Sequence, residues 1–283
     1  MAHPLNGKAV AITGAGSGLG RAYALAAGAA GAAVALSDID EVAVDETAAE
    51  LARVGARAVS VPGDIADPTT GRRLVSICAE EFGAIDGLVN NAGASHAGQS
   101  WNASDAEVEQ IFGVNVIGVI AATHAAIPVM MQQGSGSVLN VISGALLGMP
   151  EITLYGGSKG AILSLTYGWA LEVEGSGVRV NALSPLAKTS MSDRMEDTPD
   201  HLKGPPPEHI APAVIAMLAD ETAHLNGQII RFDGQRLGFM SPPAKAPGVK
   251  RESWDPSAVS GALAGELRQH AQPFGLGKRA ERR

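Results

Sequence analysis

The stretch KAVAITGAGSGLG, residues 8 to 20, decides the fold class, because an apolar run leads directly into closely spaced glycines. We predict a buried strand over Lys8 to Thr13, a glycine-rich turn, and a helix from Leu19 to Ala30. A second apolar run, Ala32 to Leu36, ends at Asp38. Strand, glycine turn, helix and strand in this order form the βαβ unit of a parallel sheet.

The same alternation continues along the chain. Further strands are expected over Ala56–Val61, Gly87–Val89, Ser137–Ile142, Val178–Leu183 and Gln228–Phe232, and further helices over Glu41–Val54, Pro68–Phe82, Ser104–Gln133, Thr153–Glu174 and Pro207–Ala219. Strands that are apolar on both faces and separated by helices form a parallel sheet covered on both sides. The sequence predicts an α/β fold, a single doubly wound domain over residues 1–237 with a seven-stranded parallel sheet. Such sheets bind ligands at the carboxyl ends of their strands.

Composition narrows the classes of partner. The chain has 283 residues, 46% of them hydrophobic, and a formal net charge of −8 at pH 7, which gives no broad basic field for a nucleic acid. The single cysteine, Cys78, excludes a disulfide within the chain and a cysteine-rich metal site. No secretory signal and no apolar run of about 18 residues are evident. We expect a cytoplasmic protein that binds small molecules, without a metal, nucleic-acid or membrane partner.

The composition changes from Gly238 onward. Prolines recur, and lysines and arginines outnumber acids. We predict that residues 238–283 form a Pro-rich, basic extension without a strand. It is either a partly disordered solvated tail or an arm that packs on a neighbouring subunit or covers the site.

The glycine turn favours a dinucleotide cofactor. Its glycines recur at every second position from Gly14 to Gly20, so a strict G-x-G-x-x-G does not fit. They still permit positive φ and a close approach of bare backbone to a pyrophosphate at a helix N-terminus. The predicted cofactor contacts are Gly14, Ser17, Gly18, Leu19 and Gly20. A structural turn without a ligand is the alternative.

Asp38 predicts which dinucleotide is used. It ends the second strand about twenty residues past the glycines, where a carboxylate accepts both adenosine ribose hydroxyls. It repels a 2′-phosphate by about 4 kcal/mol at close range, and residues 14 to 20 contain no Arg or Lys. We predict NAD rather than NADP, with Asp38 and Ile39 as cofactor contacts. A role for Asp38 as helix N-cap is the alternative.

Two more strand ends have polar or small residues. Asp64 and Ile65 follow the third strand, and Asn90, Ala92 and Gly93 follow the fourth. We predict cofactor contacts at all five positions, with simple turn formation as the alternative.

An acid/base arrangement stands in the second half of the chain. Tyr155 and Lys159 share one face of a helix, and Ser143 lies twelve residues before the tyrosine. A phenol ionises near pH ~10, so an acid/base working at neutral pH needs about 4 kcal/mol of stabilisation of its anion. The Lys159 ammonium and the positive ring of a cofactor can supply it. Alone, the spacing also fits an amphipathic helix with a surface lysine.

Together these motifs resemble the short-chain dehydrogenase/reductase family over about residues 5 to 236. The strings that carry the resemblance are Thr-Gly-x-x-x-Gly-x-Gly at 13 to 20, Asn-Asn-Ala-Gly at 90 to 93, Asn115, Ser143 and Tyr155-x-x-x-Lys159. The resemblance implies a Rossmann fold, a homotetramer or homodimer, and an NAD-dependent alcohol dehydrogenase or ketoreductase. It also implies that Tyr155 exchanges the proton of the substrate hydroxyl and that Ser143 hydrogen-bonds the reacting oxygen. By the same resemblance, Lys159 binds the nicotinamide ribose and lowers the phenol's pKa, and Asn115 holds a water of a proton relay.

One loop departs from the family pattern. Leu186 replaces the glycine that commonly follows Pro185, while Thr189 remains available to a carboxamide. All three are predicted cofactor contacts. The form Pro-x-x-x-Thr-x-Met is similar to the (3R)-hydroxyacyl-CoA dehydrogenase unit of type 2 multifunctional enzymes.

The residues expected around the substrate are mostly apolar, over positions 94–96, 145–150 and 191–195. This composition favours an apolar secondary alcohol: a hydroxyacyl thioester, a hydroxysteroid or a cyclic alcohol. His96 is either a pocket residue or a surface histidine. Two rival functions use the same fold, a non-redox dehydratase or epimerase and a dinucleotide sensor without catalysis.

Overall fold

The computed structural model describes residues 3–188, 204–243, 245, 247–271 and 275. The chain divides into two compact units, Met1–Met240 and Ser241–Arg283. The boundary lies three residues past the end expected for the domain.

Unit 1 is built on one sheet with the strand order β3-β2-β1-β4-β5-β6-β7-β8. The strands are β1 Ala9–Thr13, β2 Ala33–Ser37, β3 Ala58–Ser60, β4 Gly87–Asn90, β5 Gly136–Val141, β6 Val178–Pro185, β7 Ile229–Phe232 and β8 Leu237–Phe239. β1 pairs with β2 on one side and with β4 on the other, so the strand order reverses beside β1. The α/β doubly wound fold is confirmed, and its switch point places the carboxyl ends of β1 and β4 at a natural crevice.

The sheet has an eighth strand, Leu237–Phe239, which corrects the prediction that the segment from Gly238 onward contains no strand. β8 runs antiparallel to β7, and its three residues are exposed. The return is tight because the Asp233 carboxylate accepts hydrogen bonds from the backbone N–H groups of Gln235 and Arg236, with Gly234 at φ 86°. A three-residue exposed edge strand has no buried apolar face, and so it leaves no hydrophobic pattern in the sequence.

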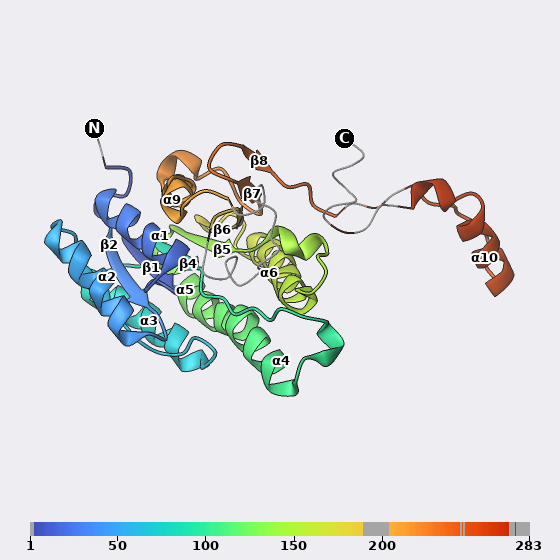
Figure 1. Ribbon diagram of the computed structural model, residues 1–283. Helices are drawn as coiled ribbons and strands as arrows, with labels where there is room; N and C mark the ends of the chain where they lie inside the picture. Colours follow the sequence, from blue (N-terminus) through green and yellow to red (C-terminus); the bar gives the residue numbers. More distant parts are fainter. Residues whose placement is uncertain (1–2, 189–203, 244, 246, 272–274, 276–283) are drawn as a thin grey trace. The chain divides into compact units, whose positions relative to one another are not determined.

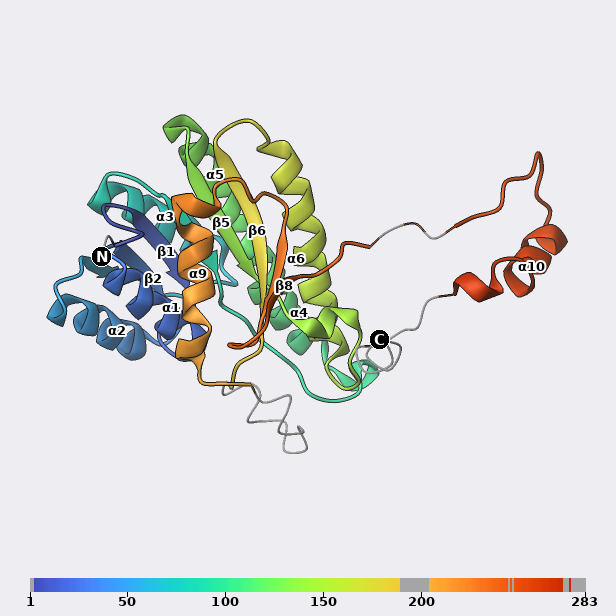
Figure 2. The same ribbon diagram turned by 90° about the horizontal axis from the view of Figure 1, so that it is seen from above.

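Helices cover both faces of the sheet (Figures 1 and 2). The bounds are α1 Gly18–Ala29, α2 Glu41–Arg53 and α9 Ala211–Leu218 for one face, and α3 Pro68–Phe82, α4 Asp105–Phe112, α5 Val119–Gln133 and α6 Thr153–Glu172 for the other. Each face has its own hydrophobic cluster. The first includes Tyr23 of α1 and Val214 of α9, and the second includes Leu74 of α3 and Trp169 of α6.

The helix ends follow capping chemistry visible in the sequence. The Asp40 side chain accepts the Ala43 N–H at the start of α2, and Ser104 and Glu107 form a capping box at the start of α4. α3 ends at Gly83, in the left-handed region at φ 84°. These local signals explain why the observed helix bounds lie close to the expected ones.

The helical run from Asp105 to Gln133 is continuous. It passes from α4 through a π-helical segment, Gly113–Gly118, into α5. Among the described residues it is the one helix long and apolar enough to cross a membrane by length and composition alone, with a mean hydropathy of 1.8 over its best window, half of it buried. This corrects the expectation that no apolar run reaches that length. In unit 1 its second half, α5, packs against α3 and the sheet, as a core helix does.

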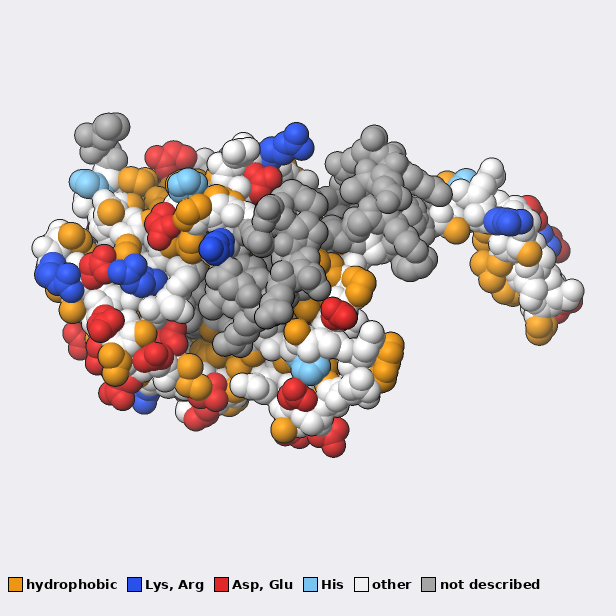
Figure 3. Space-filling view, in the orientation of Figure 1, with side chains coloured by type: hydrophobic (Ala, Val, Ile, Leu, Met, Phe, Trp, Pro, Cys, Tyr) orange, Lys and Arg blue, Asp and Glu red, His pale blue; other side chains and the backbone are white. Residues whose placement is uncertain are grey.

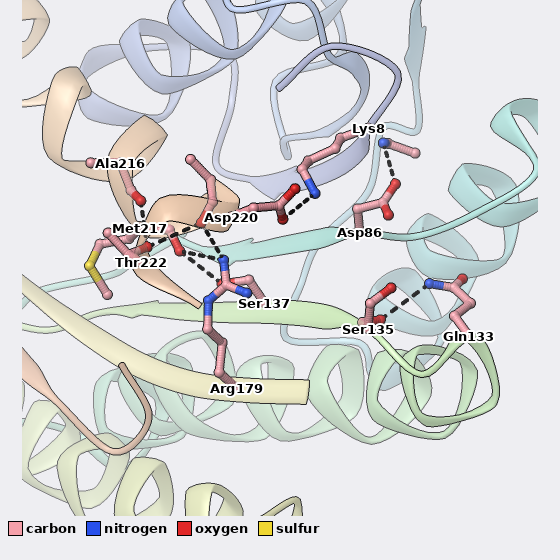
Figure 4. Close-up of polar contacts among 12 residues, drawn as sticks. Lys8, Asp86, Gln133, Ser135, Ser137, Arg179, Ala216, Met217, Asp220 and Thr222 are labelled. Atoms are coloured by element: carbon pink, nitrogen blue, oxygen red, sulfur yellow. Dashed lines mark hydrogen bonds and ion pairs between the residues drawn. The ribbon is translucent and has the colours of Figure 1, made fainter. Parts of the chain in front are cut away.

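Hydrogen bonds at the amino ends of the strands fix α9 to the sheet (Figure 4). The buried Arg179 guanidinium, near the start of β6, donates to the Met217 and Ala219 carbonyls at 3.3 and 2.9 Å. Lys8 forms an ion pair with Asp220 at 2.8 Å, just beyond the same helix end. Cations at a helix C-terminus satisfy its free carbonyls and stabilise its dipole. The polar side chains at the amino ends of these strands, Arg179 and Lys8, thus stabilise the packing of α9 on the sheet.

Unit 2 contains one helix among its described residues, α10 over Pro256–Ala264, followed by a 3₁₀ turn at Arg268–His270. The Asp255 carboxylate caps α10 by accepting the Ala258 N–H at 2.7 Å. The Arg251 guanidinium lies 4.9 Å from the centre of the Trp254 ring. In the face of the molecule shown in Figure 3, acidic and basic side chains are interspersed over unit 1.

Candidate active site

The glycine turn between β1 and α1 is so tight that two of its glycines cannot be replaced without movement. A Cβ on Gly20 would lie 1.8 Å from the Gly14 carbonyl oxygen, and a Cβ on Gly14 would lie 2.8 Å from the Ala92 Cα. Gly14 also has φ +67°, which L side chains rarely adopt. The two glycines therefore allow the first turn of α1 to pack on the end of β4.

Asn91 holds this turn, a role that the sequence analysis missed. Its side-chain amide donates to the Thr13 and Gly14 carbonyls at 3.0 and 3.1 Å. In return, the Thr13 hydroxyl accepts the N–H groups of Asn91 and Ala92. An asparagine beside a turn has many possible partners, so only the pairing of β1 with β4 identifies this one.

The outer part of the turn is open to a ligand. Gly18 has φ +51° and no atom within 4 Å of the position of a Cβ. Ser17 is the N-cap of α1, yet its side chain makes no capping hydrogen bond. A helix N-terminus with free N–H groups and an uncommitted hydroxyl fits a pyrophosphate.

Asp38 faces this turn from the end of β2. One carboxylate oxygen accepts the Gly16 N–H at 2.8 Å, and the other accepts the Asp40 N–H at 3.1 Å. The N-cap of α2 is Asp40, so the alternative role of Asp38 as that cap is wrong. Ile39, 73% exposed, offers an apolar surface beside the carboxylate. Arg21, the first cation after the glycines, forms an ion pair with Glu50.

The other strand ends differ in what they offer. After the third strand, the Asp64 carboxylate accepts the Ala66 N–H, and Ile65 is buried. The Ile65 carbonyl oxygen lies so near the long helix that a Cβ on Gly118 would come within 2.4 Å of it. The buried Asn90 amide donates to Thr123 and Asn140, so this side chain belongs to the core, and a cofactor contact at this position stays a prediction.

Gly93 lies where the strand ends meet the second half of the site. A Cβ placed on it would come 3.5 Å from Asn115 Oδ1 and 3.8 Å from Lys159 Nζ. Its backbone therefore passes beside both side chains.

Tyr155 and Ser143 come together at the carboxyl end of β5. Ser143 follows the last residues of that strand, and Tyr155 lies in the first turn of α6. The Ser143 side chain lies close enough to the phenol to lower its pKa, and its hydroxyl also accepts the Ala145 N–H at 3.2 Å. Burial raises the pKa of the Tyr155 phenol, and the neighbouring Ser143 side chain opposes this increase only in part. In the protein alone the phenol is neutral at pH 7.

Lys159 lies one helical turn further along α6 and is 3% exposed. Its ammonium donates to the Val141 carbonyl at 2.9 Å and lies 5.7 Å from the centre of the Tyr155 ring. Burial lowers the pKa of Lys159 to about 8. The lysine is thus beside the phenol, as predicted, but at this separation it does not offset the effect of burial on the phenol's pKa.

Asn115 is fully buried in the π-helical segment. Its Oδ1 accepts the Ala94 N–H at 2.8 Å, and its amide donates to the Ala94 carbonyl at 2.8 Å and to the Ser158 hydroxyl at 2.9 Å. π-Helical segments often occur at functional sites. Both amide protons are already used, so this side chain can hold a water only through its remaining oxygen lone pair.

The loop after β6 is described only at its start. Pro185 ends the strand, and the Leu186 N–H donates to the Phe232 carbonyl at 2.9 Å. The predicted contact Thr189 and the predicted substrate residues 191–195 lie outside the described residues.

The family model for short chain dehydrogenases matches residues 8–200, which include the glycine turn, Asn115, Ser143, Tyr155 and Lys159. The chain belongs to the short chain dehydrogenase family. This short chain dehydrogenase is 35% identical over 250 residues to 2-(S)-hydroxypropyl-CoM dehydrogenase 3 of Xanthobacter autotrophicus, covering 83% of this chain and 98% of the relative. It is 31% identical over 280 residues to hydroxyacyl-CoA dehydrogenase ChsB1 of Mycobacterium tuberculosis, covering 92% and 88%.

Two solved structures extend the comparison. A short chain dehydrogenase from Mycobacterium avium superposes with a TM-score of 0.85 at 29% identity, covering 95% of this chain and 97% of that one. A short chain dehydrogenase from Burkholderia cenocepacia in complex with NADP gives a TM-score of 0.75 at 29% identity, covering 82% and 98%. The family therefore establishes a nicotinamide dinucleotide oxidoreductase but leaves open the choice between NAD and NADP.

Gly20→Ala tests whether the tight turn is required in this short chain dehydrogenase. The added Cβ would lie 1.8 Å from a backbone oxygen, so α1 must move away from the turn. We expect dinucleotide affinity to fall at least about tenfold and the melting temperature to drop. Binding is measured by fluorescence titration with the reduced dinucleotide, and stability by thermal unfolding.

Gly168→Ala is the matched control. This exposed glycine in α6 has no atom within 4 Å of the point that a Cβ would occupy. Alanine should raise stability by about 0.5–1 kcal/mol through helix propensity and leave binding unchanged. Equal binding by the two variants would contradict the role given to Gly20.

Proposed function

We propose that this short chain dehydrogenase reversibly oxidises an apolar secondary alcohol to a ketone, with NAD as hydride acceptor. The observation that carries the proposal is the grouping of Tyr155 and Ser143 at the carboxyl end of β5, with the buried Lys159 ammonium 5.7 Å from the centre of the phenol ring. A phenol and a hydroxyl held together can engage one substrate oxygen, and a buried ammonium beside them favours an anion. This arrangement supports proton transfer rather than binding alone.

The proposed roles assign each proton to a named atom. Ser143 Oγ donates a hydrogen bond to the substrate oxygen, and Tyr155 Oη accepts the alcohol proton. Lys159 Nζ binds a ribose hydroxyl and stabilises the phenolate. Asn115 holds the Ala94 backbone and the Ser158 side chain in place by hydrogen bonds. When bound, NAD supplies the hydride acceptor and a positive ring near the phenol. Because burial raises the phenol's pKa in the protein alone, the tyrosine becomes a base only once that charge is present.

The preference for NAD rests on Asp38. Its carboxylate is held toward the glycine turn by the Gly16 N–H, and Arg21 is paired with Glu50 rather than free for a 2′-phosphate. A unit charge at close range costs about 4 kcal/mol against a second negative group. Because a similar short chain dehydrogenase was solved in complex with NADP, an experiment must exclude the use of NADP by this chain.

Asp38→Ser is expected to lower the preference for NAD over NADP by about a hundredfold in kcat/KM. This change corresponds to a smaller free energy than the full repulsion of about 4 kcal/mol. Asp40→Ser is the matched control, because serine keeps the N-cap function and Asp40 lies two residues away. Kinetics with both dinucleotides measure the preference. An unchanged ratio in Asp38→Ser would remove the basis of the NAD assignment.

For the substrate, we propose a hydroxyacyl thioester, a hydroxysteroid or a cyclic alcohol. The similarity to hydroxyacyl-CoA dehydrogenase ChsB1 supports the first class, because that alignment covers 92% of this chain. The apolar composition of residues 145–150 supports all three.

We further propose a homotetramer or homodimer in the cytoplasm. Exposed apolar side chains on the helical layer of α5 and α6, including Met131 at 46% and Leu171 at 73%, support self-association. The single buried thiol, Cys78, is compatible with a reducing compartment. Light scattering of the full chain measures the number of subunits. The same measurement on a chain ending at Met240 tests whether residues 238–283 act as an arm that packs on a neighbouring subunit.

The activity is tested with NAD or NADP and a panel that contains a hydroxybutyryl thioester, a hydroxysteroid, menthol, cyclohexanol and isopropanol. Steady growth of the reduced-dinucleotide absorbance identifies a dehydrogenase. Binding of NADH without turnover of any panel member or its ketone would favour a dinucleotide sensor. Product formation without a change in absorbance would favour a non-redox dehydratase or epimerase.

A further inference from the structure

A short segment after β4 is fixed at three points around the candidate active site. We call residues 94–98 the strap. At its first residue, Asn115 makes two hydrogen bonds with the backbone of Ala94, both of 2.8 Å. At its middle, His96 Nδ1 lies 3.0 Å from a carboxylate oxygen of Glu107 in α4. At its last residue, the Gly98 N–H donates to the Glu151 carbonyl at 2.8 Å.

The last of these bonds, which we call the clasp, joins the strap to the residues that lead into α6. Glu151 lies two residues before α6 begins and four before the tyrosine. At the other end of the strap, Asn115 contacts Ser158 in the same helix, and Ser158 in turn donates to the Tyr155 carbonyl. The strap is therefore tied to α6 on both sides of the reacting phenol.

The clasp is held in place at a conformational cost. Glu151 has φ +63° and is the one non-glycine residue with positive φ among those described. Its side chain is exposed, so no burial of that side chain offsets the strain. Residues kept in rare backbone conformations persist where the surroundings over-determine them, and they cluster at functional sites. This backbone conformation points the Glu151 carbonyl toward the Gly98 N–H.

We propose that the clasp is a specificity-determining contact: it fixes the strap as one wall of the alcohol pocket, and through it Glu151 acts as a positioning residue. The inference rests on the proposed function of the same site. A fixed wall binds an alcohol of matching width without first ordering a loop, which lowers its KM. Loosening the wall raises KM for that alcohol and reduces discrimination by size, while the catalytic groups stay in place.

Two substitutions at one position separate the backbone from the side chain. Glu151→Gly keeps the carbonyl and adopts positive φ without strain, whereas Glu151→Val disfavours that conformation strongly. We expect Glu151→Gly to match the parent protein. In Glu151→Val, KM for the best panel alcohol should rise about tenfold with kcat within about threefold, and the preference between wide and narrow alcohols should fall. Dinucleotide affinity should be unchanged.

A readout that does not depend on activity follows the clasp itself. Amide hydrogen exchange at Gly98 should be slow in the parent and in Glu151→Gly, and at least about tenfold faster in Glu151→Val. Gly98→Ala is a second variant, since Gly98 has φ +134° and alanine there must move the donor. It should show the same rise in KM.

The outcomes are distinct. Fast Gly98 exchange together with a parental KM and size preference in Glu151→Val overturns the inference, and so does an equal effect of Glu151→Gly, which would assign the role to the side chain. An active parent with unchanged variants overturns this inference alone. A parent that turns over no panel alcohol overturns the proposed function and this inference together.

Discussion

Tyr155→Phe should lower kcat by about a thousandfold or more in both directions, because general acid/base catalysis contributes about 10²–10⁴ in rate and phenylalanine cannot exchange a proton. The ring and its packing remain, so affinity for NADH should stay within about twofold. Turnover is measured with the best alcohol of the panel, and NADH binding by fluorescence titration. Retention of more than about a tenth of the parental kcat would refute the role of the phenol.

Tyr167→Phe is the matched control for this experiment. Tyr167 lies on the same helix, α6, three turns beyond Tyr155, and is partly exposed. It is not hydrogen-bonded to Ser143 or any other described side chain at the site. The control should keep parental kcat, which separates loss of the catalytic phenol from a general effect of removing a hydroxyl from α6.

Lys159→Met should have the second-largest effect, a loss of about a hundredfold or more in kcat/KM together with weaker dinucleotide binding. Methionine fills a similar volume but has no charge, so neither the ribose hydroxyl nor the phenolate is stabilised. The loss should appear in both KM for the dinucleotide and kcat, unlike that of Tyr155→Phe. Parental dinucleotide affinity in this variant would contradict the proposed ribose contact.

The same substitution should make the folded protein more stable at neutral pH. Burial lowers the pKa of Lys159 from 10.5 to about 8, so below pH 8 the folded state carries a buried charge that the unfolded state keeps in water. Between about pH 8 and 10.5 the unfolded state binds more protons, and the parent gains stability as pH rises. Removing the charge should thus raise the free energy of unfolding at pH 7 by up to roughly 3 kcal/mol, at about 1.4 kcal/mol per pKa unit.

The pH dependence provides the check. The stability difference between Lys159→Met and the parent should be largest below pH 8 and shrink toward pH 10.5, as measured by denaturant unfolding across that range. Lys250→Met, which removes an exposed lysine in unit 2, is the control and should change neither stability nor activity. A difference that is independent of pH would mean that packing, and not the buried charge, distinguishes the variant.

Much of the fold could be predicted because it is encoded locally. Apolar runs that end at glycines, Asp40 and Ser104 as helix caps, and Gly83 as a helix terminator each act within a few residues. The eighth strand could not be predicted, because β8 is exposed and owes its existence to pairing with β7. The long helix around Asn115 was predicted almost to its ends, but the length of its apolar stretch was not recognised because this polar residue interrupts the run, although its amide is satisfied entirely within the protein.

For the candidate site, the sequence by itself determined which chemical groups are present: the spacing of Tyr155 and Lys159 on one helix face and the glycine turn beside a buried strand. Only the tertiary structure decided their partners. Asn90 turns into the core while Asn91 holds the glycine turn, and Gly98 meets Glu151 across a gap of 53 positions in the chain. The physical reason is that spacing along one helix or turn is fixed by backbone geometry, whereas contacts between distant segments depend on how the whole sheet is paired and packed.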